Sequence, residues 1–292
     1  MLLFVQFMVN GILVGGIYAL LALAIVLIYK STRVFNFALG EMLTLGGFIL
    51  YTFMATLEFP FYLSLPATLF ASLIIGFLVE RLTMRPLIGQ PILSAVMATI
   101  ALSLMLKGIV FSVWGSPTIN FPERILPGEA RMIGQIFLND ELLLTFIVSI
   151  GVFIATGLFF QFTKTGILMR ATAEGHDIAQ AAGVNVEKIF ALTWAIVAMI
   201  AAISGILLGN RFGLGIGTLP LIAMRAFPAI LFGGLESVSG AVIGGLTVGI
   251  LESLVGGYVD PRISEITPYV ILLLVLLFRP EGLLGLKRIE RI

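Results

Sequence analysis

Long apolar runs separated by short polar loops make up most of this 292-residue chain. A helix of ~20 apolar residues crosses the ~30 Å hydrocarbon core of a bilayer. On that basis the pattern predicts spans at 5–28, 34–57, 61–80, 91–113, 139–161, 189–209 and 266–278. A glycine-rich stretch at 225–257 is long enough for two passes or for one broken helix. We therefore predict an all-α polytopic membrane protein of about eight transmembrane helices, with a re-entrant or broken helix near 225–240.

The composition agrees with lipid as the main solvent. Hydrophobic residues make up 59% of the chain, charged residues 11%, and the mean hydropathy is +1.13, whereas about a quarter of a soluble domain is charged. The chain has no cysteine and a single histidine, His176, which leaves no thiol chemistry, disulfide or histidine-rich metal centre. A net charge of +1 provides no basic field for nucleic acid. The opening MLLFVQFMVN lacks the basic start of a cleaved signal peptide, and we interpret it as the beginning of a retained helix.

Lysine and arginine favour the cytoplasmic side of a membrane. When the chain is threaded with its N-terminus outside, eleven of the 17 basic residues fall inside, five fall outside and Lys107 lies within a span. This bias predicts an external N-terminus and a cytoplasmic C-terminus for a single transmembrane domain over 1–292. The polar loop 114–138 is then external and the loop 162–188 is cytoplasmic. The same threading requires 225–257 to enter and return, with a turn in LFGGLESVSG that includes Gly233, Gly234 and Glu236.

Small residues recur at helical spacing in two regions of the chain. The first row is Gly11, Gly15 and Ala19; the later rows are Ala241, Gly245 and Gly249, and Gly240 with Gly244. Such rows let helix backbones approach closely in lipid. They predict a closely packed bundle, and they leave open whether any of these contacts slides during a functional cycle.

The cytoplasmic loop contains a short helix pattern, TAEGHDIAQAAG. Thr172 is a candidate N-cap, Glu174 and Asp177 suit the positive end of a helix, and Gly183 is placed to end it. Because its apolar surface, including Ile178, is too small to fold alone, we expect this helix to dock on a partner. The alternative is a solvated loop helix without a partner.

Ionisable residues at membrane depth are functional candidates because burying them in lipid is costly. Lys107 and Glu252 lie near helix ends, where headgroups or a neighbour such as Arg262 can serve them. Glu236 lies at the predicted turn, where it either caps backbone N–H groups or meets a partner subunit.

Glu41 lies deeper, ~10 Å in from Val34 at 1.5 Å per residue. On a helical wheel Asn36, Gly40 and Thr44 form a narrow polar and small-residue stripe close to Glu41. We predict that Asn36, Glu41 and Thr44 line a translocation path, with Glu41 meeting a substrate ammonium or holding a gate. The alternative is a buried ion pair between Glu41 and Lys30 or Arg33 that fixes helix packing.

Four segments in the same order resemble the LivH-type permease of branched-chain amino acid ABC importers. They are GGIYALLALAIVLIYKSTRVFNFALGEMLTLGGF, TGILMRATAEGHDIAQAAGVNVEKI, FPAILFGGLESVSGAVIGGLTVGILES and the terminal RPEGLLG. Two positions depart from the usual pattern: Leu39 stands where many relatives have glutamine, and Ser239 where proline is frequent.

The resemblance implies a multi-pass subunit of the cell (inner) membrane. It implies pairing with a second related permease, two cytoplasmic ABC ATPases and an extracytoplasmic substrate-binding protein. By the same resemblance, the segment from Glu174 to Gly183 is the coupling helix that contacts an ATPase. The chain itself has no G-x-x-x-x-G-K-[ST] phosphate loop, so we expect no ATPase activity of its own and no cofactor.

Three functional hypotheses remain open at this point. The first is an ABC permease for branched-chain or related amino acids, or for the urea and amides that relatives carry. The second is an ion-coupled secondary transporter that uses Glu41 as its ion site. The third, an integral membrane enzyme, lacks a catalytic constellation.

Overall fold

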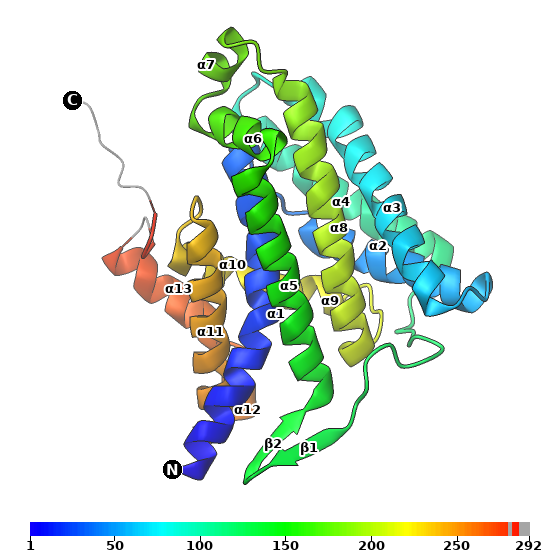
Figure 1. Cartoon of the computed structure of the whole chain (residues 1–292), viewed down its shortest axis with the longest axis vertical. Coiled ribbons are helices and arrows are strands. Elements are labelled where there is room, and N and C mark those ends of the chain that lie inside the picture. The colour runs from blue at the N-terminus through cyan, green and yellow to red at the C-terminus, as the bar shows by residue number, and fades with distance from the viewer. Residues whose placement is uncertain (280–281, 286–292) are drawn as a thin grey trace. The chain divides into compact units, whose positions relative to one another are not determined.

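The computed structural model describes residues 1–279 and 282–285, and it is built almost entirely of helices (Figure 1). The membrane-length helices are α1 (Leu2–Thr32), α3 (Phe61–Val79), α4 (Ile92–Trp114), α5 (Asp140–Phe162), α8 (Val186–Phe212) and α11 (Val238–Tyr258). The shorter helices are α2 (Leu39–Tyr51), α6 (Lys164–Glu174), α7 (His176–Ala181), α9 (Thr218–Met224), α10 (Ala226–Gly233), α12 (Pro261–Ser264) and α13 (Thr267–Phe278). Wider π-helical turns extend α2 over Thr52–Thr56 and α3 over Glu80–Met84, and a 3-10 turn follows at Arg85–Leu87.

Within the described residues, seven helical segments are long and apolar enough to cross a membrane. They correspond to the predicted spans, with α11 as the full-length part of the glycine-rich stretch. The last predicted span is α13, whose 12 residues extend about 18 Å, less than a bilayer core. The segment before α11 is a broken helix formed by α9 and α10, which are interrupted at Arg225. The predicted all-α membrane architecture with a broken helix is therefore confirmed.

The chain divides into two compact units, whose boundaries fall within α1, α5 and α9 and in the loop that precedes β1. The first unit contains 1–26, 126–151 and 223–292, and the second contains 27–125 and 152–222.

In the first unit the predicted small-residue rows pack against each other. A Cβ at Gly249 of α11 would lie 2.5 Å from the Gly15 Cα of α1, and one at Gly11 would lie 2.5 Å from the Ile250 Cα. Gly245 faces the backbone of Ala19 in the same way. Because real Cβ atoms essentially never come under 3.0 Å, only glycine permits this approach of the two helices.

A tight turn joins α10 to α11 in the same unit, as the pattern LFGGLESVSG predicts. Gly234 has a φ of +105°, and a Cβ there would lie 2.5 Å from the backbone nitrogen of Gly285. The amides of Leu283 and Leu284 donate hydrogen bonds of 2.8 and 3.0 Å to the carbonyls of Phe232 and Gly233. The described part of the terminal motif, 282–285, therefore fastens to the end of α10; Pro280 and Glu281 lie outside the described residues.

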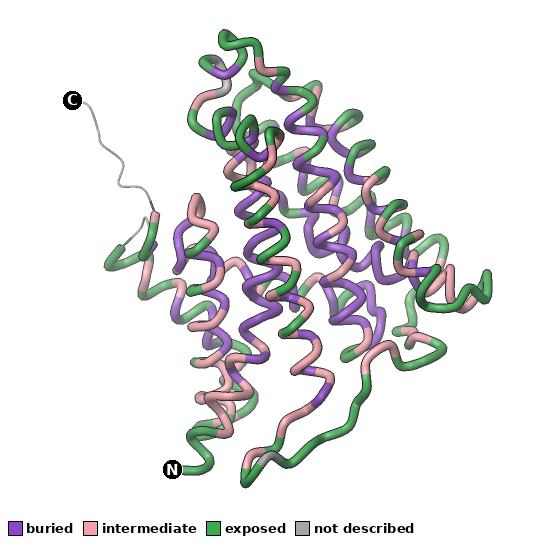
Figure 2. Tube along the Cα trace, in the orientation of Figure 1, coloured by how far each residue is buried: buried purple, intermediate pink, exposed green. Residues whose placement is uncertain are grey.

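In the second unit α8 packs on both α2 and α3. A Cβ at Gly46 of α2 would lie 2.5 Å from the Cα of Ala202 in α8. Gly205 of α8 touches the backbone of Leu43, and Gly76 of α3 touches the backbone of Trp194. Accordingly, α8 is largely buried, whereas α4 is mostly exposed (Figure 2).

The predicted loop 114–138 contains a β-hairpin that the hydrophobic pattern did not indicate. Strands β1 (Ala130–Ile133) and β2 (Ile136–Asn139) pair antiparallel, with Arg131 opposite Leu138. A side-chain amide from α1 stabilises the hairpin, since Gln6 donates to the carbonyl of Phe137 (2.7 Å) and accepts from its N–H (2.8 Å). Each strand has only four residues, too few for a clear alternation of polar and apolar positions.

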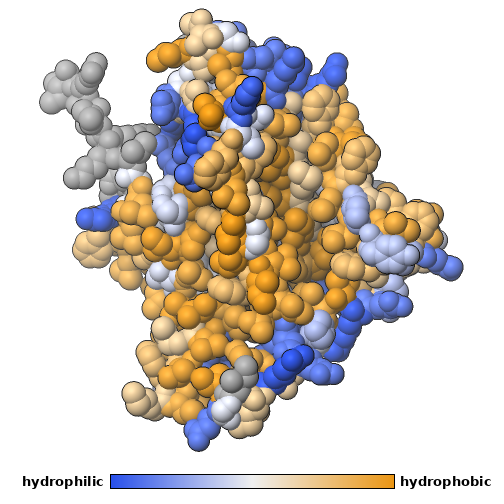
Figure 3. All heavy atoms as spheres, viewed as in Figure 1, coloured by the Kyte–Doolittle hydropathy of each residue, from blue (hydrophilic) through white to orange (hydrophobic). Residues whose placement is uncertain are grey.

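Apolar atoms cover the helices that face the viewer, whereas hydrophilic residues gather around the loops near α6 and α7 (Figure 3). Many large apolar side chains on α4 are exposed, for example Leu104 at 67%. A soluble domain buries such residues, so these helix faces require lipid or another subunit as their covering.

Candidate functional site

The stretch before α2 interrupts the second predicted span. The pattern predicts a helix from residue 34, but residues 33–38 are not helical and α2 begins at Leu39. Asn36 causes much of the interruption, because its side-chain oxygen accepts a hydrogen bond from the Ala38 amide (2.9 Å). This local bond competes with helical hydrogen bonding. The predicted helical stripe is therefore wrong at Asn36, which precedes the helix instead of lying on its face.

The interruption lies within the depth of α4. The Thr99 hydroxyl accepts from the Phe37 amide (3.4 Å), and its one hydrogen lies between two carbonyl oxygens, that of Val96 in its own helix (2.8 Å) and that of Phe35 (3.2 Å). Thr99 is fully buried and lies about 10 Å along α4 from its first residue. Irregular backbone at membrane depth is tolerated only where protein covers it or where it lines a water-filled cavity. Broken helices of this kind form substrate sites in several transporter folds.

Glu41 lies in the first turn of α2, where a carboxylate complements the helix dipole. It is half-buried and lies near Ser103 and the Lys107 ammonium, both on α4. Ser103 is the middle residue of α4, and Lys107 lies one helical turn further along the same face. The partners expected for a packing pair, Lys30 and Arg33, are not the ones that the structure gives Glu41.

Thr44, the third predicted path residue, is 2% exposed, and its hydroxyl donates to the Gly40 carbonyl (2.7 Å) in its own helix. Gly40 itself touches Pro220. Asn36 and Thr44 are thus buried and hydrogen-bonded locally. Of the predicted path residues, only Glu41 combines charge, membrane depth and partial exposure.

The loop 162–188 forms two short helices, α6 and α7, instead of one. Thr172 is not an N-cap: it lies inside α6, and its hydroxyl donates to the Leu168 carbonyl. Glu174 is the exposed last residue of α6, and Gly175 separates it from α7. The α6 helix continues through Thr172 because its own cap lies earlier, at Thr163, whose hydroxyl accepts from the Gly166 amide.

Gly183 ends α7 as predicted. Its φ is +86°, its amide donates to the Gln180 carbonyl, and the Val184 amide donates to Ala179. This pair of bonds is the Schellman arrangement that usually requires glycine. Ile178 on the same helix is 78% exposed, which leaves an apolar side chain uncovered beside a rigidly ended helix. The side chain of Asp177 lies outside the described residues.

The predicted turn residues Gly233, Gly234 and Glu236 lie together between α10 and α11. The residue that caps α11 is Ser237, whose hydroxyl accepts from the Gly240 amide (3.0 Å). Ser237 therefore supplies the N-cap of α11.

The first unit also contains a charged network that sequence reasoning missed. Glu252 of α11 accepts a hydrogen bond from the Tyr18 hydroxyl (2.7 Å) and pairs with Arg225 (2.9 Å), which also reaches Glu265 (3.2 Å). The expected neighbour of Glu252 was Arg262. Arg225 stands at the break between α9 and α10, so the network fastens this break to α1 and α11. The signal available in the sequence was the charge of Arg225 within the otherwise apolar, glycine-rich stretch.

Comparisons with known proteins show similarity along nearly the whole chain. Residues 7–276 match the family described as branched-chain amino acid transport system, permease component. The high-affinity branched-chain amino acid transport system permease protein BraD of Pseudomonas aeruginosa is 32% identical, over 99% of this chain and 98% of its own. The corresponding LivH protein of Salmonella typhimurium is 30% identical, over 100% and 98%. A probable branched-chain amino acid permease LivH of Methanocaldococcus jannaschii is also 30% identical, over 97% and 94%. With its membrane-length helices, its broken helix and this full-length similarity, the chain belongs to the branched-chain amino acid transport permease family.

Proposed function

We propose that this chain is the permease subunit of an ABC importer in the cell (inner) membrane and forms part of the path for branched-chain amino acids. The observation that carries the proposal is the similarity over the full length of relatives named for this transport. The proposed partners are a second related permease, two cytoplasmic ABC ATPases and an extracytoplasmic binding protein. The energy then comes from the ATPases, because the chain has no phosphate loop.

The loop helix α7 is the proposed contact with the ATPase. This helix has an exposed apolar side chain, Ile178, and its end is fixed by Gly183. The acidic residue Glu174, at the end of α6, precedes it. A short helix that inserts one apolar residue into a groove is a common recognition mode. The orientation in which the loop 162–188 faces the cytoplasm and the loop 114–138 faces outward is part of this proposal.

The proposed path runs along the face of α4 that carries Ser103 and Lys107. Lys107 is exposed in the isolated chain although it lies within a span. An uncovered charge at that depth is costly against lipid, which supports the second permease or a water-filled path as its neighbour. Glu41 and Lys107 together offer opposite charges that suit the ammonium and carboxylate of a zwitterionic amino acid. Asn36 and Thr44 hold the interrupted helix in place behind Glu41.

In the proposed cycle the binding protein delivers substrate outside, ATP binding closes the two ATPases, and the movement reaches the path through α7. The ion-coupled alternative would use Glu41 as a sodium or proton site. The nearby Lys107 ammonium opposes a bound cation at that carboxylate, which favours the importer.

Genetic replacement tests the proposal. A bacterial strain that lacks its own branched-chain amino acid importers receives the four partner genes with or without this chain. We expect binding-protein-dependent uptake of leucine, isoleucine and valine only when this chain is present. Uptake of urea or short amides in place of these amino acids would contradict the substrate class, and uptake that needs no ATPase genes would contradict the importer.

A further inference from the structure

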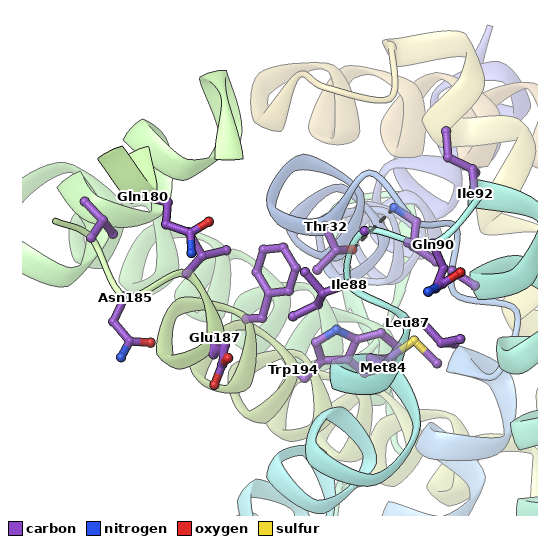
Figure 4. Close-up of a pocket in the computed structure, with 16 residues that line it drawn as sticks. Thr32, Met84, Leu87, Ile88, Gln90, Ile92, Gln180, Asn185, Glu187 and Trp194 are labelled. Carbon is purple, nitrogen blue, oxygen red and sulfur yellow. Dashed lines mark hydrogen bonds between the residues drawn. The ribbon is translucent and has the colours of Figure 1, made fainter. Parts of the chain in front are cut away.

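A cavity of about 680 Å³ in the second unit separates the turn between α3 and α4 from the segment that follows α7 (Figure 4). Residues within 84–95 form one wall, and residues within 180–194 form another. Protein interiors are otherwise close-packed, so interlocking side chains do not hold these two walls together across the cavity. Their separation therefore depends on the contacts beside it.

An ion-paired arginine bridges the two walls. The Arg85 guanidinium, in the turn, lies 3.3 Å from the Glu187 carboxylate at the start of α8, measured from Nη1 to Oε2. Its other nitrogens donate to Glu80 at the end of α3, Nε to Oε1 at 3.4 Å and Nη2 to Oε2 at 3.2 Å. Because the planar guanidinium has donors on several edges, one arginine side chain contacts both carboxylates.

The two arms of this bridge differ in burial. The Glu80 side chain is 0% exposed, that of Arg85 is 30% exposed and that of Glu187 is 59% exposed. A buried carboxylate is costly unless it is paired, so Glu80 holds the guanidinium in place. An exposed ion pair contributes little stability, so the arm to Glu187 is not needed to keep the fold. Its effect is to fix the separation between the turn and the start of α8.

The backbone changes its helical geometry on both sides of Arg85. Up to Gly76, α3 is packed tightly on α8, since a Cβ at Gly76 would lie 2.4 Å from the Trp194 carbonyl oxygen. A π-helical turn then covers Glu80–Met84, and a 3-10 turn covers Arg85–Leu87. Such wide and tight turns within helices often mark functional sites and hinges. The segment 80–87 is therefore the part of α3 best suited to shift while the rest of the helix stays packed.

Arg85 connects the end of the loop helix α7 to the start of the path helix α4. Glu187 is the second residue of α8 and comes shortly after Gly183, which fixes the end of α7. On the other side of the bridge, the turn leads into α4, which begins at Ile92 and carries Lys107. We propose that Arg85 is a positioning residue for energy coupling, which passes movement of α7 to the start of α4. The proposal rests on the proposed function, because the roles of α7 and α4 belong to it.

The ratio of ATP hydrolysed to leucine imported tests this role, because the ratio does not depend on how much of the protein folds. The complete transporter is reconstituted in proteoliposomes with ATP on the ATPase side and external binding protein loaded with labelled leucine. Glu187→Gln keeps the shape of the side chain and removes its charge. We expect it to raise the ratio about threefold, the factor expected for one partly exposed ion pair. Lys188→Gln, which removes the neighbouring exposed charge, should leave the ratio unchanged. An unchanged ratio in Glu187→Gln, or an equal rise in Lys188→Gln, overturns the proposal.

A second set of variants shows whether Glu187 acts through Arg85. Arg85→Gln alone would leave the buried Glu80 carboxylate without this partner, so it is combined with Glu80→Gln. This neutral pair should also raise the ratio about threefold, and adding Glu187→Gln should raise it no further. A further rise would show that Glu187 acts independently of Arg85, and a lower free energy of unfolding with a wild-type ratio would assign the bridge to the fold alone; either result overturns the proposal. Absence of ATP-dependent leucine uptake by the wild-type transporter contradicts the proposed function itself.

Discussion

The contact between α1 and α11 depends on glycines that leave no room for a single methyl group. We predict that Gly249→Ala destabilises the chain, because the new Cβ would lie 2.5 Å from the Gly15 Cα and 2.6 Å from the Gly11 carbonyl oxygen. Ordinary contacts begin at 3.4 Å. Both neighbours are backbone atoms of glycines, so no flexible side chain can move aside, and the helices must separate.

The structure sets the size of this effect. The shortfall is about 0.9 Å, and a gap of that order forfeits a quarter to a half of each dispersion contact along the seam. Overpacking of this kind costs about 1–3 kcal/mol. Because helix association in lipid has no hydrophobic driving force of its own, packing losses are not compensated elsewhere.

The assay is reversible unfolding of the purified chain in mixed detergent micelles, followed by circular dichroism. Gly157→Ala on α5 is the matched control, because a Cβ there meets nothing within 4 Å and alanine suits a helix better than glycine does. We expect a lower free energy of unfolding for Gly249→Ala and an unchanged or higher one for Gly157→Ala. Equal stability of the two variants would refute the close packing of α1 against α11.

Four further predictions concern coupling, the path and the charged network. Gly183→Val should uncouple ATP hydrolysis from uptake, since a β-branched residue at φ +86° disrupts the end of the helix, whereas Gly183→Asn should retain coupling. The measurement is the ratio of ATP hydrolysed to leucine imported, and equal ratios in the two variants would contradict the role of α7. Glu174→Lys should uncouple in the same assay without preventing membrane insertion, and normal transport would place the ATPase contact elsewhere. Glu41→Gln should reduce uptake while the complex still assembles on size-exclusion chromatography, and loss of assembly would instead favour a packing role. Arg225→Leu should lower the free energy of unfolding by about 2 kcal/mol, less than the loss of about 3–5 kcal/mol that follows removal of one partner from a fully buried pair. If the additional Glu252→Leu substitution fully restores stability, the cost comes from the unpaired carboxylate.

Hydrophobic length, the distribution of basic residues and the glycine pattern were sufficient to predict the spans, a re-entrant or broken helix near 225–240 and the turn at Gly233 and Gly234. The spans follow from the thickness of the bilayer, which sets the length of the apolar runs, and the turn follows from glycine, which has no side chain. Both the apolar runs and the glycines can be located in a single sequence. Gly183 was predictable for a similar reason, since few residues other than glycine end a helix in this way.

The interruption at Asn36 was not predictable, because the apolar run continues through it and hides a change of backbone. A single side-chain hydrogen bond to Ala38, supported by Thr99 from α4, outweighs the periodic pattern there. The Arg225–Glu252 pair joins residues 27 positions apart, and its partners are set by tertiary packing. The hairpin at 130–139 was missed because its strands are too short to show a period.

Energy coupling in a purified system tests the central claim most directly. Proteoliposomes that contain this chain with the second permease and both ATPases receive external binding protein loaded with labelled leucine. The account predicts leucine accumulation that requires ATP on the ATPase side and persists when ion gradients are dissipated. Accumulation driven by a proton or sodium gradient without ATP, and abolished by dissipating that gradient, would contradict it.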